Sequence, residues 1–145
     1  MVVKDAALQF LGYFSPFFAA SANVLGALAE QVPNMIVSSA DLANSDKTDG
    51  FLKKTKAFAH GDFSGAFLQA GVSELAMTAI INGMALHGGV IGACATFFVF
   101  SDYMKPALRL SALMEMPVKF IWTHDAFRVG EDVTIRNKPS GWGIE

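Results

Sequence analysis

Three short apolar runs divide the chain and predict buried strands. They occupy residues 35–39, 90–100 and 118–123, and Lys119 is the only charged residue in any of them. Each run is composed mainly of apolar, β-branched or aromatic residues, which is typical of strands covered on both faces. We therefore expect these runs to lie inside one sheet.

Helical patterns occupy the segments before and between these runs. Residues 21–30 predict a short helix with its first serine as N-cap. Residues 73–86 carry apolar or small side chains on nearly every face, which predicts a helix buried on all sides and ended by Gly88. Residues 101–114 predict a helix capped by its first two residues, with Pro106 near its first turn. The alternation of strands and helices indicates parallel βαβ units, and hence the α/β fold class.

The segment between the first strand and the first long helix is polar. Residues 46–64 combine charged side chains with the breakers Gly50 and Gly61. This composition predicts an exposed connection with no catalytic role.

Composition narrows the classes of protein that fit this pattern. The 145 residues suffice for one domain, and a hydrophobic content of 52% excludes disorder for most of the chain. The net charge of -2, without a long run of one sign, argues against a nucleic acid partner. The single cysteine, Cys94, excludes an intramolecular disulfide and favours a reducing, cytoplasmic setting.

The uncharged stretch over residues 6–29 raises the question of a membrane or signal segment. It is long enough to span a bilayer, for which about 20 apolar residues suffice. However, Asp5 offsets the charge of Lys4 and polar residues interrupt the stretch, so we expect part of a cytoplasmic domain and no membrane partner. An exported or membrane-associated protein is the weaker alternative.

Polar and aromatic side chains follow each predicted strand. Asp41 and Ser45 follow the first strand, residues 100–103 the second, and His124 and Asp125 the third. Because ligands bind beyond the carboxyl ends of the strands in an open parallel sheet, we expect these groups to meet at one edge. Each also has a plain structural explanation, as a turn residue or as part of the core.

Glu74 is a carboxylate in the first turn of a predicted helix whose other faces are apolar. The helix dipole favours its charged form, whereas loss of solvation disfavours that form, so a partner is required. Two interpretations remain open. Either the carboxylate is satisfied by its own helix N–H groups, or it handles a proton at a ligand.

Six motifs of this chain occur in order, nearly without gaps, over residues 21–132. They are Ser38-Ser39-Ala40-Asp41-Leu42, Gln69-Ala70-Gly71-Val72-Ser73-Glu74, Asn82-Gly83-Met84-Ala85-Leu86-His87-Gly88-Gly89, Thr96-Phe97-Phe98-Val99-Phe100, Thr123-His124-Asp125 and Val129-Gly130-Glu131-Asp132. Together these motifs resemble one family, the pyrimidine-binding domain of transketolase. The resemblance implies a parallel-sheet thiamine diphosphate-binding fold and the transfer of a two-carbon ketol unit between sugar phosphates in the pentose phosphate pathway.

The resemblance also implies roles for residues around the cofactor. Glu74 matches the glutamate that hydrogen-bonds a ring nitrogen of the cofactor's aminopyrimidine and so favours the imino tautomer. Phe97, Phe100 and Tyr103 match the aromatic pocket around the pyrimidine. Glu74 and His124 are the catalytic candidates.

On the substrate side, the resemblance implies a second set of contacts. Asp41, His124 and Asp132 match residues that contact substrate hydroxyl groups. Ser45 matches a sugar-phosphate contact. Phe18, in contrast, stands where the family has an arginine for that phosphate, and a phenyl ring supplies no charge.

Both ends of the chain depart from the family. Where the family continues with Gly-Pro-Thr-His, this chain has Val133-Thr134-Ile135-Arg136, and the whole tail over residues 133–145 is unlike the family. We therefore divide the chain into an apolar segment at 1–20, a partial pyrimidine-binding domain at 21–132 and a tail at 133–145. The domain is expected to be incomplete on its C-terminal side.

The missing parts imply a partner. In the family a separate domain holds the diphosphate and a divalent metal such as Mg²⁺ or Ca²⁺, commonly across a dimer, so we expect that domain on another chain or a homo-oligomer. The chain alone is expected to be an inactive half of a site. The alternative is a non-catalytic interaction module or the product of a truncated gene.

Overall fold

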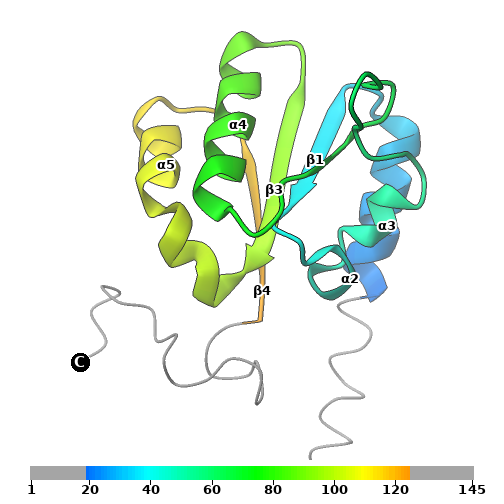
Figure 1. Cartoon of the computed structure of the whole chain (residues 1–145), viewed down its shortest axis with the longest axis horizontal. Helices are drawn as coiled ribbons and strands as arrows, with labels where there is room; N and C mark the ends of the chain where they lie inside the picture. The colour runs from blue at the N-terminus through cyan, green and yellow to red at the C-terminus, as the bar shows by residue number, and fades with distance from the viewer. Residues whose placement is uncertain (1–18, 125–145) are drawn as a thin grey trace, which may run out of the picture.

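A four-stranded parallel sheet forms the centre of the fold in the computed structural model, which describes residues 19–124 (Figure 1). The strands are β1 (Met35–Ser39), β2 (Phe67–Gln69), β3 (Ile91–Phe97) and β4 (Lys119–Thr123). They lie in the order β2-β1-β3-β4, and every neighbouring pair is parallel. The predicted α/β class, the parallel arrangement and the three predicted strands are therefore confirmed.

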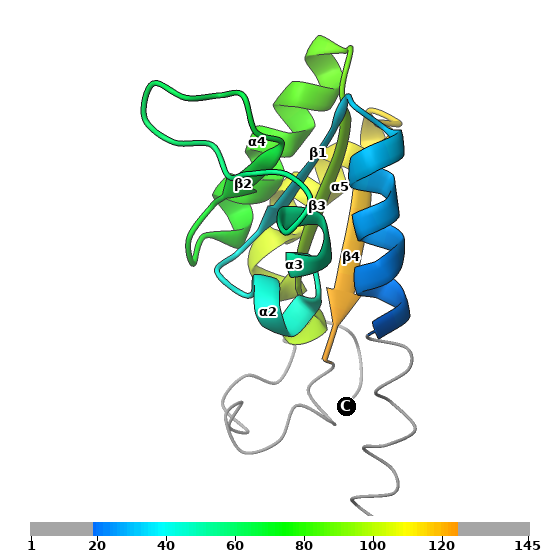
Figure 2. The same cartoon turned by 90° about the vertical axis from the view of Figure 1, so that its right-hand side faces the viewer.

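Helices cover both faces of the sheet. Helices α4 (Glu74–His87) and α5 (Ser101–Leu113) pack on one face, and the other carries the helix that ends at residue 31 together with α2 (Ala43–Asp46) and α3 (Asp49–Leu52) (Figure 1). Figure 2 shows the helix over residues 19–31 running alongside β4. Two hydrophobic clusters, one on each side, make up the core.

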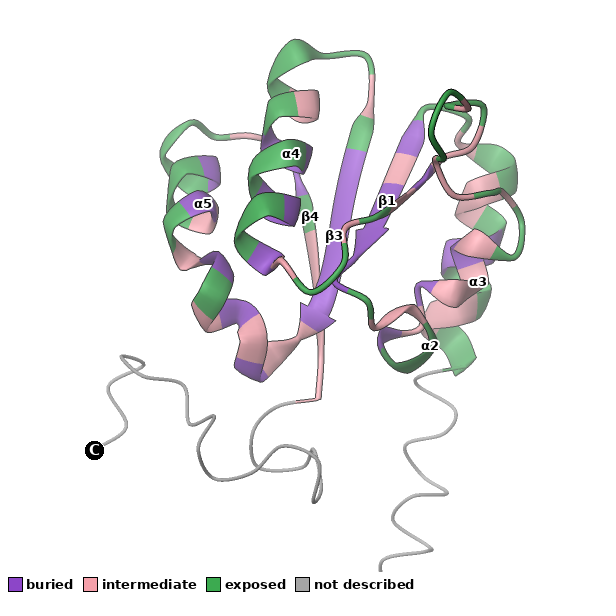
Figure 3. Cartoon of the chain, in the orientation of Figure 1, coloured by how far each residue is buried: buried purple, intermediate pink, exposed green. Residues whose placement is uncertain are grey.

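Strand β3 is the most enclosed element. Its residues from Gly92 to Thr96 are all buried (Figure 3), and their side chains are small. A Cβ atom on Gly92 would lie 2.6 Å from Cγ2 of Ile81 in α4, so this glycine lets the helix approach the strand closely. Gly88 ends α4 with φ of 87°, and its N–H donates to the carbonyl oxygen of Met84, as the predicted glycine cap requires.

The structure corrects the predicted end of the second strand. Strand β3 ends at Phe97, and the next three residues form the short 3₁₀ helix η1 (Phe98–Phe100) instead of extended chain. Helix α5 follows η1 directly, so its N-cap is Phe100 and no side chain caps it. Pro106 consequently lies inside α5, beyond its first turn.

Two predictions about helix surroundings are wrong. Helix α4 is not buried on all sides, because Leu75, Ile80 and Leu86 are exposed while Met77 and Ile81 face the core. Apolar residues on both sides of this helix hid the direction in which it packs. Ser21 lies within the first helix and not before it, so it is not an N-cap.

The segment over residues 46–64 is less exposed than its composition suggests. Asp46, Thr48 and Phe51 are fully or almost fully buried, and Phe51 belongs to the same core cluster as Val37. The edge strand β2 was also absent from the sequence prediction. It has only three residues, too few to show a periodicity.

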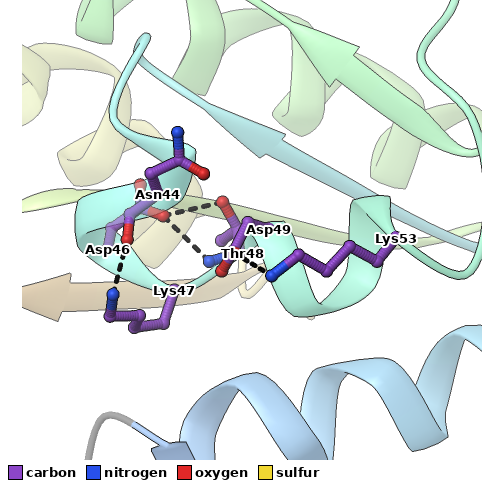
Figure 4. A network of polar contacts seen from close by, with 6 residues as sticks. All are labelled: Asn44, Asp46, Lys47, Thr48, Asp49 and Lys53. Carbon is purple, nitrogen blue, oxygen red and sulfur yellow. Dashed lines mark hydrogen bonds and ion pairs between the residues drawn. The ribbon is translucent and has the colours of Figure 1, made fainter.

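A buried carboxylate holds the connection between β1 and α3 in place (Figure 4). Asp46 is fully buried, and it accepts hydrogen bonds from Ser39 Oγ at 2.6 Å, Thr48 Oγ1 at 2.7 Å and the Thr48 backbone N–H at 3.0 Å. Burial raises the pKa of Asp46 above its usual value of 3.8, and these hydrogen bonds oppose that shift. Ser39 Oγ in turn accepts from the N–H of Leu42.

Replacing Gly50 by alanine is expected to destabilise the fold. A Cβ atom on Gly50 would overlap the backbone carbonyl of Ala22, where α3 crosses the first helix. Because backbone cannot move aside cheaply, we expect Gly50→Ala to lower the free energy of unfolding by about 1–3 kcal/mol in urea titrations. Gly83→Ala is the matched control. Nothing lies within 4 Å of its added Cβ, so it should stabilise α4 by about 0.5–1 kcal/mol, and equal effects of the two would contradict this packing.

The stability contributed by Asp46 should fall as pH rises. Because its pKa is raised in the folded state, its contribution is fully present below pH 3.8 and is lost as pH rises through the folded value. The free energy of unfolding of the wild type minus that of Asp46→Asn should therefore decrease between acidic and neutral pH. Asp62→Asn should give the opposite slope, because Lys56 holds the pKa of Asp62 well below its usual range. If this difference instead grows with pH, burial is not the main influence on the pKa of Asp46.

Candidate functional site

The carboxyl ends of β1, β3 and β4 meet at one edge of the sheet. The parallel register pairs Ser39 with Ala95 and Phe97 with Thr123, so the segments that follow these strands leave the sheet together. Asp41 and His124, which follow β1 and β4, have left-handed backbone with φ of 64° and 41°. Such backbone is uncommon for residues with a Cβ and is concentrated at functional sites.

Glu74 lies at the N-terminus of α4, beside this edge. Its side chain is buried, with 6% of the residue exposed, and Thr96 Oγ1 lies 3.4 Å from Oε1 as a hydrogen-bond donor. Thr96 is itself fully buried, the last residue of the enclosed part of β3. The free N–H groups of the first helical turn favour a negative charge here. The fold therefore holds a carboxylate at the helix N-terminus, and within the described part of the chain it has a single, long side-chain hydrogen bond, which leaves acceptor capacity for a ligand.

Four rings form a continuous series along the same edge. His124 lies 4.2 Å from Phe97 between ring centroids, Phe97 stacks on Phe100 at 5.7 Å, and Phe100 stacks on Tyr103 at 6.2 Å. The 3₁₀ helix η1 explains the stacking of Phe97 on Phe100 across it, because residues three apart lie over one another in that conformation. Phe97, Phe100 and His124 are half-buried, and Tyr103 is exposed. The structure thus brings these four predicted site residues together.

The imidazole of His124 is placed by its neighbours. Its Nδ1 lies 2.9 Å from Thr123 Oγ1, and its ring rests on Phe97. Burial lowers the pKa of His124, the positive charge of Lys47 lowers it further, and Asp46 partly opposes both. The ring is therefore mainly neutral at pH 7, with one nitrogen as donor and the other as acceptor.

The other predicted substrate residues fall into two groups. Asp41 and Ser45 are exposed and lie on the segment that the Asp46 hydrogen bonds hold. Asp125 and Asp132 lie outside the described residues, as does Phe18. Their predicted roles stay predictions.

Three residues at this edge were missed by the sequence reasoning. Asp46 and Lys47 were assigned to an exposed connection, and Thr96 was placed in an apolar strand and in a family motif, but without a role of its own. The spacing of Asp46 and Thr48 was an available signal, since an aspartate that accepts the N–H two residues later is a recognised turn. Thr96 is the one hydroxyl in β3, next to the strand's carboxyl end.

The described part of the chain contains neither a metal-ligating cluster nor a helix that could span a membrane. Within residues 19–124, no group of three or more His, Cys, Asp and Glu side chains could hold a metal ion. Among the helices of this described part, none is both long and apolar enough to cross a membrane.

Comparisons with curated proteins point to one family. Residues 16–136 match the family model for the transketolase pyrimidine binding domain. The chain is 51% identical over 114 residues to the transketolases of Halalkalibacterium halodurans and Bacillus subtilis, an alignment that covers 79% of this chain and 17% of each relative. The chain thus matches about a sixth of the length of these relatives.

Solved structures agree with that assignment. A transketolase from Leishmania mexicana superposes with a TM-score of 0.75 at 36% identity, covering 80% of this chain and 17% of that one. A transketolase from Pichia stipitis in complex with sedoheptulose-7-phosphate superposes with a TM-score of 0.74 at 39% identity, covering 79% and 18%. With the family model matching most of its length, the chain belongs to the transketolase pyrimidine-binding domain family.

Proposed function

We propose that this chain supplies the pyrimidine-binding half of a thiamine diphosphate site for ketol transfer between sugar phosphates. The observation that carries the proposal is the buried carboxylate of Glu74 at the start of α4, beside an edge lined by stacked aromatic rings. A carboxylate and flat apolar surfaces are what a planar ring with polar nitrogens requires. The carbon–carbon chemistry comes from the cofactor, which supplies a carbanion when bound.

The residues at this edge fit the pyrimidine portion of that cofactor. Phe97, Phe100 and Tyr103 would bind the ring by stacking and exclude water from it. Glu74 would accept a hydrogen bond from a ring nitrogen at one of its carboxylate oxygens and hold the proton there. Because Thr96 is its one side-chain hydrogen-bond partner among residues 19–124, the carboxylate retains the capacity to accept that bond.

The diphosphate portion requires a second domain. We assign the diphosphate and its Mg²⁺ or Ca²⁺ to a separate domain, because this chain matches only 17% of the length of its transketolase relatives. The outer face of α4 supports such a partner, because it is uncharged and exposed. It consists of Leu75, Ala76, Ala79, Ile80, Gly83 and Leu86, and the exposed Val72 lies just before the helix. Exposed apolar surface of this kind is typical of a protein interface, with a partner domain or with a second copy of the chain.

Substrate binding would use the residues that follow β1 and β4. Asp41 and His124 would contact sugar hydroxyl groups, Ser45 the sugar phosphate, and Asp132 a further hydroxyl. A neutral His124 suits this role, because its ring can both donate and accept a hydrogen bond. We place the partial domain at residues 21–132, between the segments 1–20 and 133–145. We further propose that the activity belongs to the pentose phosphate pathway in the cytoplasm.

A second function has one observation in its favour. The chain spans 17% of the length of its curated relatives. A non-catalytic interaction module that keeps the apolar face of α4 would fit that coverage. Activity on addition of the complementary domain separates the two functions.

The proposed function predicts that Glu74 matters only in the partnered protein. We expect this chain alone to be inactive, and to gain ketol transfer activity when mixed with the diphosphate-binding domain of Bacillus subtilis transketolase, thiamine diphosphate and Mg²⁺. In that mixture Glu74→Gln should lower activity by about 100-fold or more, because the amide keeps the shape but cannot hold the proton. Steady-state assays of both proteins measure this.

Glu115→Gln is the matched control for that experiment. Glu115 is an exposed residue in the turn between α5 and β4, at the opposite edge of the sheet, so its variant should keep full activity. Full activity in the partnered Glu74→Gln protein would show that another carboxylate acts. Activity of the unpartnered wild type would refute the half-site.

A further inference from the structure

Strand β3 presents one hydroxyl group to helix α4. Side chains alternate between the two faces of a strand, so every second residue of β3 lies on the same face. Gly92 lies against Ile81 of α4, and Cys94 belongs to the core cluster that contains Ile81. Thr96, the next residue on that face, is fully buried. Its hydroxyl therefore needs an acceptor within the protein, because a buried hydroxyl without one is unfavourable.

The course of α4 over β3 brings that acceptor to Thr96. The helix and the strand lie side by side and run in opposite directions (Figure 1). About 10 Å of helix separates Ile81 from Glu74, and about 13 Å of strand separates Gly92 from Thr96. Because Ile81 lies against Gly92, these similar lengths place the start of α4, and with it Glu74, beside Thr96.

The hydroxyl group distinguishes the two oxygens of the Glu74 carboxylate. Thr96 Oγ1 lies 3.4 Å from Oε1, whereas Oε2 accepts no side-chain hydrogen bond from the described part of the chain. A hydrogen bond of 3.4 Å is long for two oxygens. Hydrogen bonds in sites without a ligand are often long and shorten when the ligand binds. Thr96 is thus the side chain that can set the orientation of this carboxylate.

We propose that Thr96 is a positioning residue for Glu74, whose hydroxyl binds Oε1 and so leaves Oε2 directed at a ring nitrogen of a bound pyrimidine. The proposal rests on the proposed function, which places a pyrimidine ring at this edge. The last torsion of a glutamate side chain has broad minima, so a carboxylate without this contact would turn more freely. A hydrogen bond from a hydroxyl also favours the ionised carboxylate, the form that can accept from the ring.

Three substitutions isolate the hydroxyl of Thr96. Thr96→Val keeps the shape of the side chain and removes the hydroxyl, whereas Thr96→Ser keeps the hydroxyl. Thr78→Val is the matched control, because Thr78 is also fully buried and its hydroxyl donates to the backbone carbonyl of Glu74 at 2.8 Å. The control therefore removes a buried hydroxyl next to Glu74 without touching its carboxylate.

The first measurement uses the full chain alone and the carbon-13 magnetic resonance of its glutamate carboxyl groups. The Glu74 signal is identified by its absence from Glu74→Gln. Thr96→Val should shift this signal, and Thr96→Ala, which also lacks the hydroxyl, should shift it in the same direction. Thr96→Ser and Thr78→Val should leave it near its wild-type position. An unchanged signal in Thr96→Val, or an equal shift in Thr78→Val, would overturn the proposal.

The second measurement uses the chain mixed with the diphosphate-binding domain, thiamine diphosphate and Mg²⁺. Thr96→Val should lower kcat about tenfold, as expected for loss of one hydrogen bond to a charged group, and leave KM for the sugar phosphate unchanged. Thr96→Ser should recover most of kcat. An unchanged kcat in Thr96→Val would also overturn the proposal. If the wild-type mixture is inactive, the proposed function fails, and the carbon-13 signals still decide whether Thr96 positions Glu74.

Discussion

Helices pack so closely on both faces of β3 that this strand accepts only small side chains, and the other elements are arranged around it. From Gly92 to Thr96 the strand is buried and its side chains are small, and at Gly92 a single added carbon would meet Ile81 of α4. Polar groups buried there would lose hydration without finding partners. Polar side chains therefore lie at the end of the strand, where Thr96 contacts Glu74 and the ring of His124 packs on that of Phe97.

The edge that results from this packing is held by a second constraint, the burial of Asp46. A carboxylate removed from water is unfavourable unless its oxygens are hydrogen-bonded, and three hydrogen bonds from Ser39 and Thr48 offset part of that cost. The same contacts tie α2 to the end of β1. They support the strained backbone at Lys47 and fix the segment that carries Ser45. The position of these side chains thus depends on one buried acid outside the predicted site.

The sequence predicted those features that depend on long apolar patterns or on a glycine that ends a helix. The strands β1, β3 and β4, their parallel order and the glycine at the end of α4 follow from such patterns. The pattern around Glu74 also marked a carboxylate in apolar surroundings. Sequence failed where a tertiary contact decides the outcome. The three-residue strand β2 exists because β1 offers it a partner, and Asp46 is buried within hydrogen bonds from Ser39 and Thr48.

The same reasoning explains why one face of α4 was misjudged. Periodicity cannot distinguish a helix buried by its own domain from one that has an apolar face left for another protein. In this chain the face with Leu75 and Ile80 is exposed, although it resembles the buried face with Met77 and Ile81 in composition. That face and the carboxylate beside it are consistent with one account, in which this chain completes a cofactor site that a second domain begins.

Whether this chain completes a cofactor site can be tested directly by measuring how tightly the cofactor binds. Isothermal titration of thiamine diphosphate, with Mg²⁺, into the diphosphate-binding domain of Bacillus subtilis transketolase should be carried out with and without this chain. We expect a clearly lower dissociation constant for thiamine diphosphate when the chain is present, because Glu74 and the stacked rings add contacts to the pyrimidine. Equal affinity in the two titrations, with no association between the two proteins, would contradict it.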